Sequence, residues 1–218
     1  MSGCAESFSK VPHGLSIHHK SSSEHLLTLK DQCIAIDNFD VTHVPKTIDL
    51  RAPSSFFEQP TDNTTDEAWL ELLAPANIRV TAAELARNNR NSVELPGGGY
   101  LAWLGVYHEI HCLNLLRKWK YRSHYFPDIT PEREDLLQFH TDHCLDRIRA
   151  TLMCSPDTSS LVTFDWRKAQ KPVVNATKTL HSCVDWKHVI ESTRSRSVSS
   201  AEMKSLVNPN LVGRGIKK

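Results

Sequence analysis

The sequence His108-Glu-Ile-His111-Cys112-Leu113 recurs 32 residues later as His140-Thr-Asp-His143-Cys144-Leu145. The match continues to Arg117, which corresponds to Arg149. In an α-helix, residues three and four apart lie on one side, so each His-x-x-His-Cys unit places two imidazoles and one thiol on the same face. Two such helices packed face to face would bring four imidazoles together. The repeat therefore predicts a single domain in which the two motif helices pack face to face.

The segments around the repeat predict a single, mainly α-helical domain with a few short β-strands. Helical spacing of apolar residues runs from Val106 to about Tyr121, and Thr130 followed by Pro131 marks the start of a long second helix that ends near Met153. Capping boxes at 64–67 and 81–84 predict two shorter helices, and a final helix is expected at 185–192. Strands are expected at 78–80 and 161–166, and a strand or early helical stretch at 100–103.

The composition along the chain divides it into three parts. Residues 1–45 are rich in Ser and His with little periodicity, so we expect a flexible N-terminal segment. Residues 46–191 are expected to form the folded domain. Residues 192–218 contain six basic residues and one acid, which predicts a basic, Ser-rich and solvated C-terminal tail.

Length and charge exclude several classes of protein. The 218 residues suit one domain with extensions, and 39% hydrophobic residues are too many for a disordered chain. The net charge of +1 gives no reason to expect a nucleic-acid partner. No segment approaches the roughly 20 apolar residues of a membrane span, and no secretory signal is visible at the N-terminus. Taken alone, these features point to the cytosol.

Four imidazoles in one place predict a metal site. The candidate ligands are the motif histidines, His108, His111, His140 and His143. A His-rich site without carboxylate favours copper or zinc over magnesium or calcium. The alternative is that they are ordinary interior or interface residues, and two pairs at identical spacing argue against it. Glu109 and Asp142 lie inside the motifs and either orient the ligands or face solvent.

The second half of the chain also contains four of the six cysteines, Cys112, Cys144, Cys154 and Cys183. An even set allows two disulfides. Cys112 and Cys144 could instead be soft metal ligands or buried small apolar residues. We favour disulfides, because a redox copper would oxidise free thiolates beside it.

The two motifs and their surroundings resemble the fungal UstYa-like oxidase family. The likeness runs from about Trp69 to Trp186. The segments that carry it are Tyr107-His-Glu-Ile-His-Cys-Leu113, Leu152-Met-Cys-Ser-Pro-Asp157, Gly99-Tyr-Leu-Ala-Trp-Leu-Gly-Val-Tyr107, Tyr125-Phe-Pro127, Thr163-Phe-Asp-Trp166 and Cys183-Val-Asp-Trp186.

The resemblance implies a copper-dependent oxidase of a fungal secondary-metabolite pathway. Such an enzyme uses dioxygen for oxidative tailoring, by cyclisation, hydroxylation or halogenation, of a peptide or another natural-product intermediate. The four motif histidines would hold copper and form the catalytic site, with zinc or iron less favoured. The alternative is a zinc-stabilised, non-catalytic partner protein in the same pathway. A homodimer or a heterodimer with a paralogue is open, because two-His halves can complete a site across an interface.

The resemblance also implies the lumen of the secretory pathway, although family members commonly carry an N-terminal membrane anchor and no such segment is visible here. Thiols do not stay reduced in that compartment, so we expect Cys154 to pair with Cys183. Two sequons, at Asn63 and Asn175, predict N-glycans there, and we expect Asn175 on a surface loop.

Overall fold

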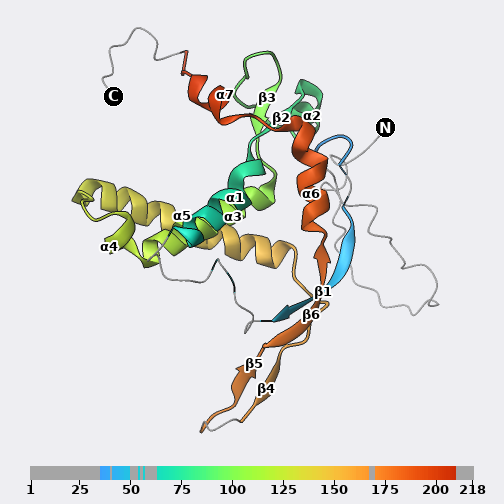
Figure 1. Cartoon of the computed structure of the whole chain (residues 1–218), viewed down its shortest axis with the longest axis vertical. Coiled ribbons are helices and arrows are strands. Elements are labelled where there is room, and N and C mark those ends of the chain that lie inside the picture. The colour runs from blue at the N-terminus through green and yellow to red at the C-terminus, as the bar shows by residue number, and fades with distance from the viewer. Residues whose placement is uncertain are drawn as a thin grey trace, which may run out of the picture.

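A computed structural model describes residues 35–39, 41–49, 54, 56, 63–166 and 170–209 of the chain. As predicted, the architecture is mainly α-helical with a few short strands, which form three two-stranded antiparallel sheets in the described part (Figure 1). Most of the expected N-terminal segment, residues 1–34, lies outside the described residues.

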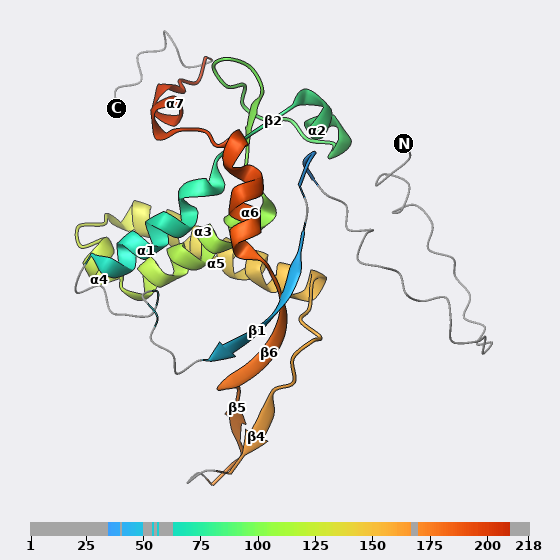
Figure 2. The same cartoon turned by 45° about the vertical axis from the view of Figure 1, so that its right-hand side comes forward.

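Two helices carry the repeated motifs and lie side by side in both views (Figures 1 and 2). Helix α3 spans Gly105–Lys120 and helix α5 spans Pro131–Cys154. Basic residues occupy the last turn of α3, and Glu132 and Glu134 occupy the first turn of α5, so the charges at these ends complement the helix dipoles. The short helix α4 (Arg122–Tyr125) lies in the connection. The sequence predicted both long helices within about a residue of their ends.

Helix α1 (Thr64–Leu73) packs against α3 through the repeat arginine Arg117. The guanidinium of Arg117 pairs with Asp66, donates to the Tyr125 hydroxyl at 2.7 Å, and lies 5.6 Å above the Trp69 ring. The capping box predicted at 64–67 is not formed, because the helix begins one residue earlier and Asn63 occupies the N-cap without a side-chain hydrogen bond.

A small apolar core lies beyond α1, where strand β2 (Ile78–Val80) pairs with β3 (Tyr100–Ala102) and helix α2 (Ala82–Arg87) covers them. The short 3-10 helix Ala74–Ala76 leads into β2. The predicted capping box of α2 is confirmed, since Thr81 and Glu84 exchange both hydrogen bonds. Ile36, Ile78 and Val80 form the buried cluster. Ile36 comes from the segment expected to be a flexible lead-in, so the folded domain reaches further towards the N-terminus.

A β-sheet arm projects away from the helices (Figures 1 and 2). Strand β1 (His43–Asp49) pairs antiparallel with β6 (Lys178–Val184) along seven residues. Strand β4 (Thr163–Asp165), inside the strand predicted at 161–166, pairs with β5 (Val173–Asn175). Both sheets have only two strands, so their apolar side chains are only partly covered.

The C-terminal segment differs from the solvated tail that its composition predicted. Helix α6 (Trp186–Thr193) runs into the 3-10 helix Arg194–Arg196, and helix α7 (Ser200–Ser205) follows. Val198 is buried, and Ser197 forms a β-bridge with Ile78. The buried carboxylate of Glu84 anchors this segment to the domain by an ion pair with Arg196 at 2.9 Å. Residues 194–198 therefore pack on the domain.

No helix in the described part of the chain is both long enough and apolar enough to cross a membrane.

Candidate metal centre

The four motif histidines meet across the α3–α5 interface. The rings of His108 and His143 have their centres 5.9 Å apart, and those of His111 and His140 are 6.1 Å apart. Within α5, the rings of His140 and His143 are 6.3 Å apart. The first histidine of each motif faces the second histidine of the other motif, because the two helices run in opposite directions. The structure thus brings the motif histidines together as two facing pairs, and a single four-histidine site remains a prediction.

The donor set fits a copper or zinc ion, although the rings are slightly too far apart as placed. Two imidazoles on one tetrahedral ion, with bonds of about 2.0–2.1 Å, have ring centres roughly 5 Å apart. The observed pairs exceed this separation by roughly 1 Å. Accordingly, no group of three or more His, Cys, Asp or Glu side chains among the described residues is placed to hold a metal ion. The side chains of His140 and His143 are exposed, so they have room to rotate towards the α3 histidines.

The environment favours neutral imidazoles on α3. Burial lowers the pKa of His108, with the charge of Arg147 and the neighbouring His143 acting in the same direction. Burial also lowers the pKa of His111, with help from His140 and His108. A neutral imidazole keeps a nitrogen lone pair free for a metal, whereas an imidazolium has none.

The two motif cysteines lie at the helix interface, behind the histidines. Cys112 and Cys144 are both fully buried and form no disulfide in the structure. Burial, together with the hydrogen bond that the Cys144 thiol donates to Cys112, raises the pKa of Cys144 to about 12. A thiol with that pKa stays protonated at neutral pH in the metal-free protein. This geometry favours the buried, small apolar role over the soft-ligand role.

The other two cysteines also stand as free thiols, Cys154 exposed at the end of α5 and Cys183 half-buried in β6. The Cys154–Cys183 disulfide remains a prediction. Of the two sequon residues, Asn63 is exposed, and Asn175 is half-buried at the end of β5, where it accepts a hydrogen bond from Thr177 at 2.8 Å. The expected loop position of Asn175 is therefore wrong, because Asn175 is the last residue of strand β5. Glycosylation remains a prediction.

The acids inside the motifs have different surroundings. Glu109 accepts a hydrogen bond from the Thr151 hydroxyl at 2.9 Å and lies 3.5 Å from Arg147, so it ties α3 to α5 rather than orienting a histidine by a direct contact. Asp142 is exposed on α5. Sequence reasoning missed Arg147 and Thr151, because their role depends on which turns of the two helices are adjacent.

Aromatic side chains close one side of the cluster. Trp103 packs edge-on against His111, with ring centres 5.5 Å apart, and its indole N–H donates to Asn77 at 2.7 Å. Tyr107 is completely buried against Trp186, and its hydroxyl has no hydrogen-bond partner among the residues that the structure describes. Trp103 is thus positioned to fix the orientation of one histidine, whereas Tyr107 belongs to the core.

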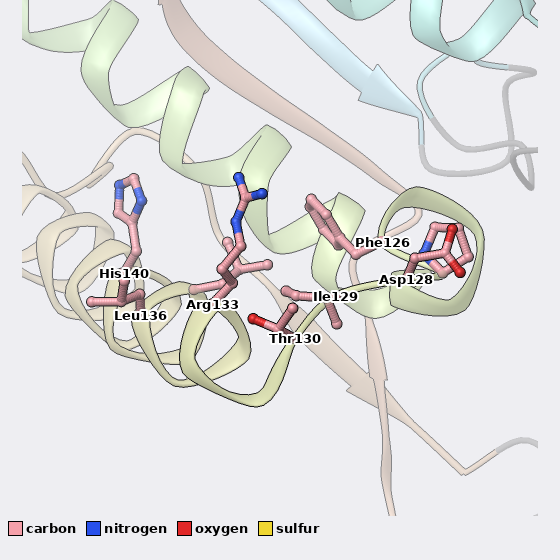
Figure 3. Close-up of a pocket in the computed structure, with 9 residues that line it drawn as sticks. Phe126, Asp128, Ile129, Thr130, Arg133, Leu136 and His140 are labelled. Carbon is pink, nitrogen blue, oxygen red and sulfur yellow. The ribbon is translucent and has the colours of Figure 1, made fainter. Parts of the chain in front are cut away.

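Sequence reasoning also missed a cavity next to His140. It has a volume of about 530 Å³ and lies between the loop 126–130 and the first turns of α5 (Figure 3). Arg133 and His140 both line it. Their spacing of seven residues is the available signal, since it places both side chains on one face of a helix.

Comparison with known proteins identifies the family. The family described as "Mycotoxin biosynthesis protein UstYa" matches residues 9–196. The UstYa family oxidase phomYc of Diaporthe leptostromiformis is 32% identical over 123 residues, covering 52% of this chain and 48% of its own. The UstYa family oxidase phomYc' of the same fungus is 33% identical over 116 residues, covering 52% and 40%.

A third relative carries a different functional name. Transacylase cctO of Talaromyces islandicus is 28% identical over 126 residues, covering 54% of this chain and 42% of its own. The chain therefore spans about half the length of the curated relatives that it matches. No solved structure matches it. With the family match extending over most of the sequence and both motif helices inside it, the chain belongs to the UstYa family.

Proposed function

We propose that this protein is a copper-dependent oxidase that tailors an intermediate of a fungal secondary-metabolite pathway. The observation that carries the proposal is the meeting of His108 with His143 and of His111 with His140. The UstYa family oxidases among its relatives support the assignment to oxidative chemistry. Cyclisation, hydroxylation and halogenation are the reactions that the family resemblance implies.

Copper, when bound, supplies one-electron redox chemistry with dioxygen as the oxidant. The four histidines would hold it as neutral donors, as the lowered pKa values of His108 and His111 favour. Trp103 limits the rotation of His111, and Glu109 keeps the two helices in contact through Thr151. The exposed sides of His140 and His143 leave an approach for a substrate from solvent.

Acyl transfer, which the name of cctO suggests for that relative, has less support here. Acyl transfer through an acyl-enzyme needs an activated nucleophile such as a thiolate. The two cysteines nearest the histidines are buried, and Cys144 has its pKa raised to about 12 by burial and its contact with Cys112. A thiol in that environment stays protonated and shielded from a substrate.

Metal analysis of single-histidine variants tests the proposal. His108→Ala, His111→Ala, His140→Ala and His143→Ala should each lower copper occupancy severalfold and remove copper-dependent oxygen consumption with ascorbate, with similar effects because the four act as one unit. His124→Ala, an exposed histidine on α4, is the matched control and should change neither. Circular dichroism should be unaltered in all five variants.

The zinc-stabilised partner protein is the competing interpretation. It requires that the metal-free protein, offered both ions, retains zinc and not copper, and that each histidine variant unfolds, because structural zinc contributes directly to folding free energy. Zinc at full occupancy without copper-dependent oxygen consumption would refute the oxidase proposal.

A further inference from the structure

The cavity beside His140 has one wall of apolar side chains and one free cation. The loop 126–130 supplies Phe126 and Ile129, and the first turns of α5 supply Leu136 and Leu137. Leu136 is 70% exposed even though it faces this hollow, so a large apolar surface there has no partner in the described part of the chain. Figure 3 shows Leu136 beside His140 at one end of the hollow and Phe126 and Ile129 towards the loop at the other.

Arg133 is the cation. It lies between His140 and the loop, and in Figure 3 its guanidinium and the His140 imidazole both project from α5 towards α3. Within the described residues, no hydrogen bond or ion pair engages Arg133, whereas the other arginines on this helix are paired: Arg147 with Glu109, and Arg149 with Asp146. The planar, fixed fork of an arginine suits a carboxylate or a phosphate.

The neighbouring charges favour a monoanion. Asp128 also lines the cavity, at the end away from His140. With the Asp128 carboxylate opposing the charge of Arg133, the site has little net positive charge, so a phosphate dianion would meet repulsion that a carboxylate largely avoids. The apolar wall requires that the rest of the ligand be hydrophobic.

The geometry points to a substrate site for apolar carboxylic acids, an inference that rests on the proposed function. We infer that Arg133 binds the carboxylate and that the apolar body of the substrate lies over Leu136 and Leu137 towards His140. Seven residues of α-helix rise about 10 Å, so the carbon presented to the histidine cluster lies on the order of 10 Å from the carboxylate. Arg133 is a specificity-determining residue in this arrangement.

Binding measurements on the metal-free protein test the inference independently of any redox activity. The probe is 6-phenylhexanoate, whose ring can reach the His140 end, and its comparison ligands are 6-phenylhexanamide and the shorter phenylacetate. Isothermal titration calorimetry should show binding of the acid about tenfold or more tighter than of the amide, because an ion pair with Arg133 is lost in the amide. Phenylacetate should bind more weakly than 6-phenylhexanoate, because it covers less of the apolar wall.

Variants assign the effect to the cavity. Arg133→Gln should reduce the affinity for the acid to that for the amide, and Arg133→Lys should retain part of the difference because it keeps the charge. Leu136→Glu, a change at an exposed position that should not disturb the fold, should weaken binding of the acid. Arg149→Gln, on the same helix but outside the cavity, is the matched control and should have no effect.

The two proposals fail in different ways. Equal affinities for acid and amide, or an Arg133→Gln variant that binds the acid as tightly as the wild type, would overturn the substrate site even if the copper-loaded protein consumes oxygen. Conversely, charge-dependent binding in a protein that shows no copper-dependent oxidation would retain the carboxylate site and remove the oxidase.

Discussion

Arg117 and Arg149 occupy equivalent positions in the sequence repeat, yet their side chains have different surroundings. Arg117 has only 9% of its side chain exposed and binds Asp66 and Tyr125, thereby fixing α1 and α4 on α3. Arg149 is 58% exposed, and its contacts stay on its own helix, where it pairs with Asp146 at 2.7 Å and donates to the Met153 sulfur at 3.0 Å. The repeat therefore predicts the backbone and the motif faces, while the role of a repeated side chain depends on what packs against its helix.

This difference predicts unequal effects of the same substitution. Arg117→Ala should lower the free energy of unfolding by about 3 kcal/mol, because it removes several hydrogen bonds and leaves the Asp66 carboxylate without its cation. Arg149→Ala should cost less than about 0.5 kcal/mol, as is usual for an exposed pair within one helix. Urea unfolding followed by tryptophan fluorescence measures both. Equal losses in the two variants would show that the Arg117 network adds nothing to stability.

At the scale of elements, the long helices were predictable and the long strands were not. α3 and α5 carry periodic apolar residues, and α5 also has a recognisable start at Thr130 and Pro131, so local sequence is sufficient to define them. β1 and β6 contain polar and charged residues on half-exposed faces, and each becomes a strand only because the other pairs with it from more than 100 residues away. Such pairing leaves no local pattern that a single sequence reveals.

The connection between α2 and the C-terminal segment also escaped sequence reasoning, because it depends on one buried carboxylate. Glu84 is 1% exposed. It accepts hydrogen bonds from the backbone N–H groups of Thr81 and Asp37 and from the Arg196 guanidinium. Burial alone would raise the pKa of Glu84, but these donors outweigh it and lower the pKa to about 2.

The pKa of Glu84 predicts how stability depends on pH. In the unfolded chain this group titrates near its ordinary value of 4.5, so the folded state holds the ionised form more tightly. Its stabilising contribution is complete above pH 4.5 and disappears as the pH falls towards 2, with a loss of about 3 kcal/mol. Glu84→Gln should destabilise the protein at pH 7 and flatten the decline of unfolding free energy between pH 4.5 and pH 2. A wild-type slope that the variant leaves unchanged would assign the acid sensitivity to other carboxylates.

For the whole molecule, the boundaries of the domain are the part that composition described least well. The first 45 residues and the last 27 both have the Ser-rich character of solvated segments, yet Ile36 and Val198 are buried. A single apolar residue within a polar segment gives too weak a signal to predict burial, because its partners come from distant strands. The cavity at His140 escaped prediction for a similar reason, since it needs the loop 126–130 to fold back over α5.

Truncation tests the position of the C-terminal boundary. A chain ending at residue 193 loses Arg196 and Val198, so it should unfold at lower urea concentration, by about 3 kcal/mol or more, because Glu84 is left as an unpaired buried charge. A chain ending at residue 199 keeps both contacts and should remain within about 1 kcal/mol of the full chain. Equal midpoints for the two truncated chains would place the functional end of the domain before residue 194.

Arg196, near the C-terminal end of the described domain, contacts Asp37 near its N-terminal end, and this contact has a mechanical consequence. Besides binding Glu84, the Arg196 guanidinium donates to the backbone carbonyl of Asp37 at 2.9 Å. Tension applied between residues on the N-terminal side of Asp37 and those beyond Arg196 would first load this contact. The intervening chain, including both histidine helices, would bear that force only after the contact breaks, so an attachment at either end of the protein is mechanically isolated from the histidine cluster.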